Sequence, residues 1–233
     1  MGRLFRLRAD SVAFPPADQA LKEPAGLLAV GGDLRPERLL AAYRQGIFPW
    51  YDDSSPILWW SPDPRMVLEP AQVHVSRSLR KTLRRNTCHI SMDCAFDEVI
   101  GYCAGLRQES QGTWITEDMQ RAYRTLHKLG YAHSVEVWQQ QQLVGGLYGI
   151  ALGRMFFGES MFSLADNASK IAFVALCRQL SEWHFDMIDC QMPTEHLSSL
   201  GARPVARTEF LHRLSRNAQN PDQTGYWKFT AEL

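Results

Sequence analysis

The sequence lacks the features that mark membrane-spanning, secreted and metal-binding proteins. No run of about 18 apolar residues occurs in the 233-residue chain, so we expect no membrane span. The opening residues, MGRLFRLRAD, contain no apolar stretch of the kind found in signal peptides. The five cysteines form no C-x-x-C pair and the seven histidines no H-E-x-x-H motif, so neither a disulfide framework nor a metal site is expected. These absences predict a cytoplasmic protein with reduced thiols, no metal and no other cofactor.

An excess of charge of either sign is also missing. Lysine and arginine together number 25, and so do aspartate and glutamate. This balance excludes a generally basic protein that coats nucleic acid, but it leaves room for a local basic patch. With 45% hydrophobic residues and no repeats, the chain is long enough for one large domain or two small ones around a substantial core.

Turn-forming and aromatic residues crowd the first quarter of the chain. Apolar residues at helical spacing nevertheless predict a helix over residues 35–45, with Pro36 in its first turn and Asp33 as a nearby cap. The proline-rich WWSPDPR that follows favours a domain boundary. We therefore predict a small, irregular N-terminal domain over residues 1–65 and a second domain over residues 66–233.

The second domain is predicted to begin with helices and to continue with a sheet. Ser76 and Thr116 are placed to cap two of the helices, and Asn167 to cap a later one. The expected helices cover residues 76–85, 93–106 and 116–129, followed by strands at 132–138, 143–152 and 154–157, a helix to residue 181, a strand at 185–190 and a short helix at 195–200. From residue 132 the order is β-β-β-α-β-α, which predicts an α+β fold with a mostly antiparallel sheet.

A one-sided block of cations lies in the first of these helices. Five cations and no acid occur between residues 77 and 85, namely Arg77, Arg80, Lys81, Arg84 and Arg85. At helical spacing four of them share one face, while Val75, Leu79 and Leu83 share another. The pattern is compatible with an ordinary solvated face and equally with a patch that contacts phosphates. Because phosphate contacts carry no base-sequence information, such a patch suits a protein that accepts several nucleic acids.

Tryptophans are dense in the first part of the chain. Trp59 and Trp60 are adjacent, and we expect them in the core. Trp50 follows Pro49 in a turn, and Trp114 precedes a helix start, both of which are places where side chains can line a cleft. Stacking of a base on such a ring is worth about 1–3 kcal/mol and tolerates any base.

Three polar residues stand in apolar surroundings. Strand alternation in MIDCQMP places Asp189 and Gln191 on one face, opposite Ile188 and Cys190. A carboxylate there must be paired or hydrogen-bonded, so Asp189 is either a structural residue satisfied by backbone donors or half of an acid–amide pair that handles a proton. Glu159, in FFGESMF between a strand end and a helix, is a further acid of this kind, with a loop salt bridge as the alternative.

Nine short motifs run through the chain in order: GLLAVGGDL, GIFPWY, LWWSPDPR, GTWIT, SVEVW, LVGGLYG, GESMFS, NASK and IDCQ. Across residues 13–205 this series resembles the bacterial leucyl/phenylalanyl-tRNA–protein transferases. The resemblance implies transfer of leucine or phenylalanine, with methionine as a further candidate, from its tRNA to proteins that begin with arginine or lysine, which marks them for degradation. It also implies a C-terminal domain similar to the GNAT acyltransferase fold, and we expect the protein to act as a monomer.

The resemblance further implies roles for particular residues. Asp189 and Gln191 match the family's proposed catalytic relay, whereas Trp50 and Trp114 match residues that line the site for the aminoacyl-adenosine end. Glu159 matches an acid in the same cleft, and we expect it to bind the basic acceptor side chain. The basic helix matches the proposed contact with the body of the tRNA.

These types of residue fit the chemistry of amine attack on an ester. We expect Asp189 to polarise Gln191, whose amide oxygen accepts a hydrogen bond from the attacking amine. The donor side chain needs an apolar pocket, because each buried methylene is worth about 0.8 kcal/mol. The candidates for that pocket are Phe157, Met161, Phe162 and Ile188.

Two other functions are compatible with parts of the sequence. A CoA-dependent N-acyltransferase would have the same fold, but no Q/R-x-x-G-x-G/A pyrophosphate loop precedes the helix expected at Asn167. A non-catalytic tRNA-binding module would explain the basic helix and the tryptophans, but it would leave Asp189 and Gln191 without a purpose.

Overall fold

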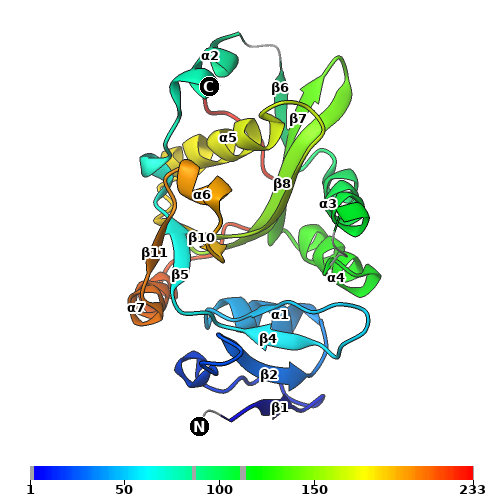
Figure 1. Cartoon of the computed structure of the whole chain (residues 1–233), viewed down its shortest axis with the longest axis vertical. Helices are drawn as coiled ribbons and strands as arrows, with labels where there is room; N and C mark the ends of the chain where they lie inside the picture. Colours follow the sequence, from blue (N-terminus) through cyan, green and yellow to red (C-terminus); the bar gives the residue numbers. More distant parts are fainter. Residues whose placement is uncertain (1–2, 86–87, 111–113, 233) are drawn as a thin grey trace.

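The computed structural model describes residues 3–85, 88–110 and 114–232, which form two sheets flanked by helices (Figure 1). Gly112 and Thr113 of the GTWIT motif lie outside the described residues. Within the described ranges, no helix combines the length and the apolarity needed to cross a bilayer.

The N-terminal part of the chain forms a four-stranded sheet around one helix. The strands lie in the order β1 (Phe5–Leu7), β2 (Leu27–Gly31), β4 (Leu58–Trp60) and β3 (Phe48–Pro49), with the 3-10 helix η1 (Ala17–Gln19) before β2 and helix α1 (Pro36–Tyr43) after it. Trp59 is fully buried, and its indole N–H donates to the Gly31 carbonyl at 2.8 Å. The predicted cap of α1 is wrong, because Asp33 accepts instead from the backbone N–H of Arg35, one residue before the helix.

The rest of the chain builds a seven-stranded, mostly antiparallel sheet. Its strands lie in the order β11 (Arg203–Val205), β5 (Arg65–Leu68), β10 (Met187–Gln191), β9 (Met155–Ser163), β8 (Gln142–Leu152), β7 (Ala132–Gln139) and β6 (His89–Met92). The helices are η2 (Pro70–Gln72), α2 (Arg77–Arg84), α3 (Phe96–Ser110), α4 (Glu117–Lys128), α5 (Ala168–Glu182), α6 (Glu195–Ser199) and α7 (Arg207–Asn217). The pair β9 and β10 is parallel.

The predicted order β-β-β-α-β-α is confirmed by β7, β8, β9, α5, β10 and α6. Ser76 and Thr116 cap α2 and α4 as predicted, each accepting a backbone N–H. The third strand is longer than expected, so Glu159 lies within a strand and not in a loop. Asn167 precedes α5 with a left-handed backbone, at φ 62°, but its side chain makes no capping bond. The Ser163 hydroxyl accepts from the Ser169 N–H in its place.

Helices cover both faces of the large sheet. Helix α5 packs on one face, and α3 and α4 pack on the other (Figure 1). The core on the α3 and α4 side continues into the N-terminal unit, since Tyr43 and Trp59 belong to the same cluster as Phe157 and Phe210. The two sheets therefore share one core, through which the N-terminal unit packs against the larger sheet.

Candidate active site

A cavity opens where the two parallel strands separate. Strands β9 and β10 are paired at three positions, the last of which joins Asp189 to Phe157. Beyond this point β9 runs on to Ser163 and β10 to Gln191 without pairing to each other. The space between them is a cavity of about 390 Å³, within the usual range for sites that hold a small ligand.

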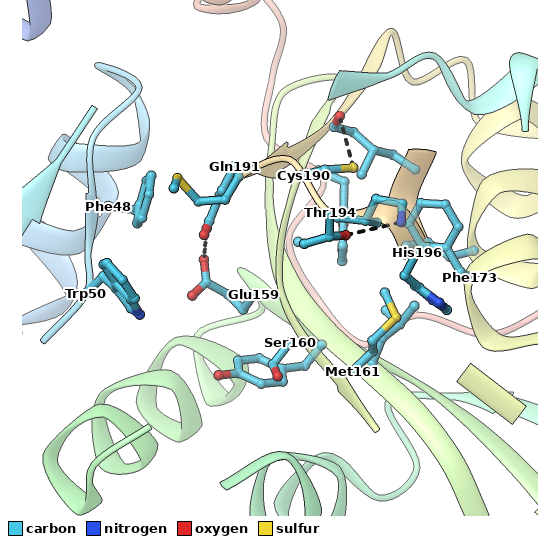
Figure 2. Close-up of a pocket in the computed structure, with 18 of the residues that line it drawn as sticks. Phe48, Trp50, Glu159, Ser160, Met161, Phe173, Cys190, Gln191, Thr194 and His196 are labelled. Carbon is cyan, nitrogen blue, oxygen red and sulfur yellow. Dashed lines mark hydrogen bonds between the residues drawn. The ribbon is translucent and has the colours of Figure 1, made fainter. Parts of the chain in front are cut away.

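The cavity has an aromatic end, a polar middle and an apolar end (Figure 2). The N-terminal unit supplies Phe48 and Trp50 to the aromatic end, and Trp114 is a further aromatic residue of the lining. The polar side chains are those of Glu159, Ser160, Gln191, Thr194 and His196. The apolar lining includes Leu147, Phe156, Met161, Phe173, Leu176, Ile188 and Leu197.

Irregularities in two strands orient the side chains of Glu159 and Gln191, which point toward one another in Figure 2. On β9, Ser160 pairs with Tyr148 and Gly158 with Gly149, which leaves Glu159 as the extra residue of a bulge. On β10 a second bulge falls between Asp189 and Gln191, and Gln191 has a φ of 60°. Bulges re-aim side chains and are common beside active sites.

The second bulge overturns the prediction that Asp189 and Gln191 share a face. Asp189 is fully buried and accepts two hydrogen bonds from Arg65, at 2.8 and 2.7 Å. The Arg65 guanidinium also donates to the Gly46 carbonyl and lies 4.8 Å from the ring centre of Phe48. Asp189 meets Gln191 through the backbone, because its carboxylate accepts the Gln191 N–H at 2.9 Å. The contact of Asp189 with Gln191 thus runs through the backbone, and the expected polarisation of the Gln191 side chain stays a prediction.

The side-chain amide of Gln191 contacts Glu159 instead. Gln191 Nε2 donates to Glu159 Oε1 at 2.8 Å. The Tyr43 hydroxyl lies 2.7 Å from the same oxygen, and the Tyr123 hydroxyl lies 2.9 Å from Glu159 Oε2. Burial raises the pKa of Glu159 to about 7, and the charge of Asp189 acts in the same direction, against the hydrogen bonds from Tyr43, Tyr123 and Gln191.

This environment disfavours the predicted acceptor-binding role of Glu159. Both of its oxygens are already engaged by three neighbouring groups, and only 8% of the residue is exposed. With a pKa near 7, Glu159 is also only partly ionised at neutral pH. A basic acceptor side chain would thus find both carboxylate oxygens of Glu159 already hydrogen-bonded, on a group that is only partly charged at neutral pH.

Half of the predicted donor pocket lies elsewhere. Met161 and Ile188 line the cavity, whereas Phe157 and Phe162 do not. Phe157 packs against Tyr43, and Phe162 stacks on Tyr102 at 4.9 Å. The reason is strand alternation on either side of the β9 bulge, which turns Phe156 and Met161 to the cavity and the other two to the opposite face.

The two predicted cleft tryptophans both line the cavity. Trp50 is 43% exposed and packs edge to face on Trp60, whose indole N–H donates to the Trp50 carbonyl at 2.7 Å. Trp114 is half-buried just before the cap of α4. These positions leave ring surface available to a flat ligand group.

The cations predicted to bind tRNA all lie on the surface. Arg77, Arg80, Lys81, Arg84 and Arg85 are exposed, and none of them forms an ion pair with any other residue that the structure describes. A groove beside α2, of about 450 Å³, is lined by Arg80 and Arg84 and by Arg178 of α5. Arg178 is a cation that sequence reasoning missed, because α2 and α5 are far apart in the chain.

Several site residues were not identified from the sequence. A buried carboxylate at Asp189 signals that a cationic partner exists, but the choice of Arg65 depends on strand pairing. Tyr43 and Tyr123 have the helical spacing of ordinary core residues, so nothing marks their hydroxyls. Thr194 caps α6, with its hydroxyl accepting the Leu197 N–H, and His196 lines the cavity from the same helix.

Comparisons with known proteins cover almost the whole chain. The family described as leucyl/phenylalanyl-tRNA protein transferase matches residues 67–215, and the N-terminal domain of that family matches residues 32–63. A leucyl/phenylalanyl-tRNA–protein transferase of Stutzerimonas stutzeri is 60% identical over 92% of this chain and 95% of its own length. The corresponding protein of Nitrosomonas europaea is 56% identical over 97% of this chain and 96% of its own length.

Solved structures give only distant likenesses. A GCN5-related N-acetyltransferase from Kribbella flavida is 10% identical, with a TM-score of 0.37 over 73% of this chain and 61% of that one. A conserved protein of unknown function from Bacteroides thetaiotaomicron is 12% identical, with a TM-score of 0.43 over 91% and 71% of the two chains. Because these structural similarities are so distant, the family of this chain is assigned from its sequence relatives alone.

Proposed function

Because the chain belongs to the leucyl/phenylalanyl-tRNA protein transferase family, we propose that it transfers leucine or phenylalanine from an aminoacyl-tRNA to the N-terminal arginine or lysine of other proteins, marking them for degradation in the cytoplasm. The observation that carries this proposal is the cavity between β9 and β10. This cavity has an apolar end and an aromatic end, and the amide of Gln191 lies between them.

The donor amino acid is proposed to occupy the apolar end. Phe156, Met161, Phe173 and Ile188 form a wall without a charged side chain, which suits leucine, phenylalanine or methionine. Each carbon of the donor that is buried there adds about 0.8 kcal/mol to binding. Discrimination against a β-branched isomer depends on shape, so it should be limited to about 10–200-fold.

The terminal adenosine of the tRNA is proposed to lie at the aromatic end of the cavity. Trp50 and Trp114 offer rings to its base, and stacking of this kind is worth about 1–3 kcal/mol. This arrangement places the ester between the rings and the apolar wall, beside Gln191. The exposed cations of α2 would then contact the phosphates of the tRNA body.

Gln191 is proposed to receive the attacking amine. Its Nε2 donates to Glu159, and its amide oxygen accepts no hydrogen bond from the residues that the structure describes, so this oxygen can accept one from the amine. The amine nitrogen then attacks the ester carbonyl, the bond from that carbon to the ribose oxygen breaks, and the proton lost by the amine balances the one gained by the ribose. Asp189, locked to Arg65, serves as a positioning residue that fixes the Gln191 backbone.

The α5 terminus makes a CoA-dependent acyltransferase the weaker alternative. Its first turn packs tightly on β8, where a Cβ on Gly145 would lie 2.5 Å from the Ala168 side chain. The N–H groups of the first turn have no partner within the helix, and one of them, that of Ser169, donates to the Ser163 hydroxyl. These contacts take up part of the surface on which a pyrophosphate would need to sit.

A transfer assay tests the proposal. Radiolabelled leucyl-tRNA is mixed with the protein and with a peptide that begins with arginine, and the peptide is analysed by mass spectrometry. We expect one leucine on the N-terminal amine, and we expect RNase treatment of the donor to abolish the transfer. Transfer from leucyl-CoA would instead identify a CoA-dependent acyltransferase.

A further inference from the structure

Three contacts among four oxygen atoms, those of Glu159 and of two tyrosine hydroxyls behind it, need more hydrogen atoms than the two tyrosines provide. The Tyr43 and Tyr123 hydroxyls are 2.5 Å apart, and each also contacts one oxygen of Glu159. Each tyrosine has a single hydroxyl hydrogen. Three contacts therefore share two hydrogens, and the triangle of Tyr43, Tyr123 and Glu159 is complete only when Glu159 carries a proton.

The Gln191 contact does not supply the missing hydrogen. Its Nε2–H fills a fourth contact, to Glu159 Oε1, and does not reach the contact between the tyrosines. If Glu159 is ionised, one contact of the triangle holds two oxygens together without a hydrogen. The contact between the tyrosine oxygens is the shortest of the three, so it is the most costly one to leave empty.

We propose that Glu159 is a titrating positioning residue, which holds a proton within the triangle and, once it has lost that proton, strengthens Gln191 as the acceptor for the attacking amine. This inference rests on the proposed function for its catalytic consequence, but the triangle itself can be tested without it. When Glu159 is ionised, its bond from Gln191 Nε2–H becomes charge-assisted and draws electron density toward the amide oxygen. Glu159 is not consumed, since the amine and the ribose oxygen balance the proton of the transfer.

The groups around Glu159 come from five elements. Tyr43 lies on α1, Tyr123 on α4 and Tyr148 on β8. Burial raises the pKa values of Tyr43 and Tyr123 well above the ordinary value, so these two hydroxyls stay neutral. Asp189 on β10 is an anion whose charge is offset by Arg65 on β5. Cys190, next to it, has a pKa raised by burial and by Asp189 and also stays neutral. Tyr43, Tyr123 and Cys190 thus stay neutral near pH 7, whereas a pKa of about 7 lets Glu159 change charge there.

The direction of the pH dependence follows from this raised pKa of about 7. Below that pH each of the three contacts of the triangle contains a hydrogen, and the Gln191 amide donates to a neutral carboxyl group. Above it Glu159 is an anion, and transfer should be faster. The acceptor amine, with an ordinary pKa of about 7.7–8.0, also loses its proton in this range, so the pH profile of the wild-type protein alone does not isolate Glu159.

Carbon-13 NMR tests the triangle directly in the full-length protein. With labelled glutamate δ-carbons and tyrosine ζ-carbons, we expect one glutamate signal to titrate with a midpoint between about 6 and 8, and two tyrosine signals to shift in the same step. Glu159→Gln should remove the glutamate signal, and Tyr43→Phe and Tyr123→Phe one tyrosine signal each. If all glutamates of the wild-type protein titrate below about pH 5.5, the inference is wrong, whether or not the variants fold.

A single-turnover assay tests the catalytic consequence. Glu159→Gln should transfer about tenfold more slowly than wild type at pH 8.5, but within about threefold at pH 6, with unchanged tRNA affinity. The control Glu182→Gln, at an exposed position, should follow the wild-type profile. Equal ratios at both pH values would contradict the inference. Absence of transfer by wild type at every pH would contradict the proposed function and leave the NMR result to decide on the triangle.

Discussion

At the scale of single residues, the site depends on where two strands depart from regular alternation. Glu159 is the extra residue of one bulge, and Gln191 follows the extra residue of the other. The same departures send Asp189 into the core, where Arg65 neutralises it. Residues that a regular strand would place together thereby have different environments, and in the proposed mechanism one has a structural task and the other a chemical one.

Substitutions at Asp189 and Gln191 should separate those tasks. Asp189→Asn leaves the Arg65 charge buried without a partner, which should lower the free energy of unfolding by about 3–5 kcal/mol. Gln191→Ala should change it by no more than about 1 kcal/mol while slowing single-turnover transfer by about 10²-fold. Urea unfolding and transfer with saturating leucyl-tRNA measure the two effects.

The paired replacement of Arg65 by Met and Asp189 by Leu is the matched control. Because it removes both charges, it should recover most of the stability that Asp189→Asn loses. An Asp189→Asn protein as stable as wild type would contradict the structural task given to the carboxylate.

At the scale of elements, helix α2 is a short amphipathic helix with one buried anchor. Leu79 is buried, Ser76 caps the first turn, and the five cations point to solvent. A helix of eight residues is marginal in isolation, so its packing on α5 keeps it in place. Arg178 extends its basic surface onto α5.

Neutralising Arg80, Lys81 and Arg84 together should weaken tRNA binding and make it less dependent on salt. Each lost phosphate contact should reduce the slope of log K against log salt by about 0.7–0.9. The control replaces three exposed cations elsewhere, Lys22, Lys128 and Arg216, and should leave the slope unchanged. Binding measured by filter retention between low and physiological salt decides the matter, and equal slopes in all three proteins would place the tRNA on another face.

The sequence predicted elements well where local signals were strong. The strands β7 and β8 and the caps of α2 and α4 depend on nearby residues, and these predictions hold. The bulges were missed because Glu159 and Cys190 become extra residues only through pairing with β8 and β5. For the same reason Phe157 and Phe162 were assigned to the wrong face of β9.

At the scale of the whole molecule, the cavity is assembled from both sheets. Phe48 and Trp50 reach it from the N-terminal unit, and Arg65 ties the start of β5 to Asp189 on β10. The boundary after residue 65 remains a prediction, but a protein cut there would lose the aromatic end of the site. The shared core explains how motifs spread from residue 26 to residue 191 come to lie around one cavity.

The most direct measurement of the central claim is a crystal structure with a stable donor analogue bound. The analogue is adenosine that carries phenylalanine on its 3′ position through an amide in place of the ester. The phenyl ring should lie among Met161, Phe173 and Ile188, the adenine against Trp50 or Trp114, and the linking carbonyl beside Gln191. A phenyl ring outside the space between β9 and β10, or a carbonyl out of reach of Gln191, would contradict the account.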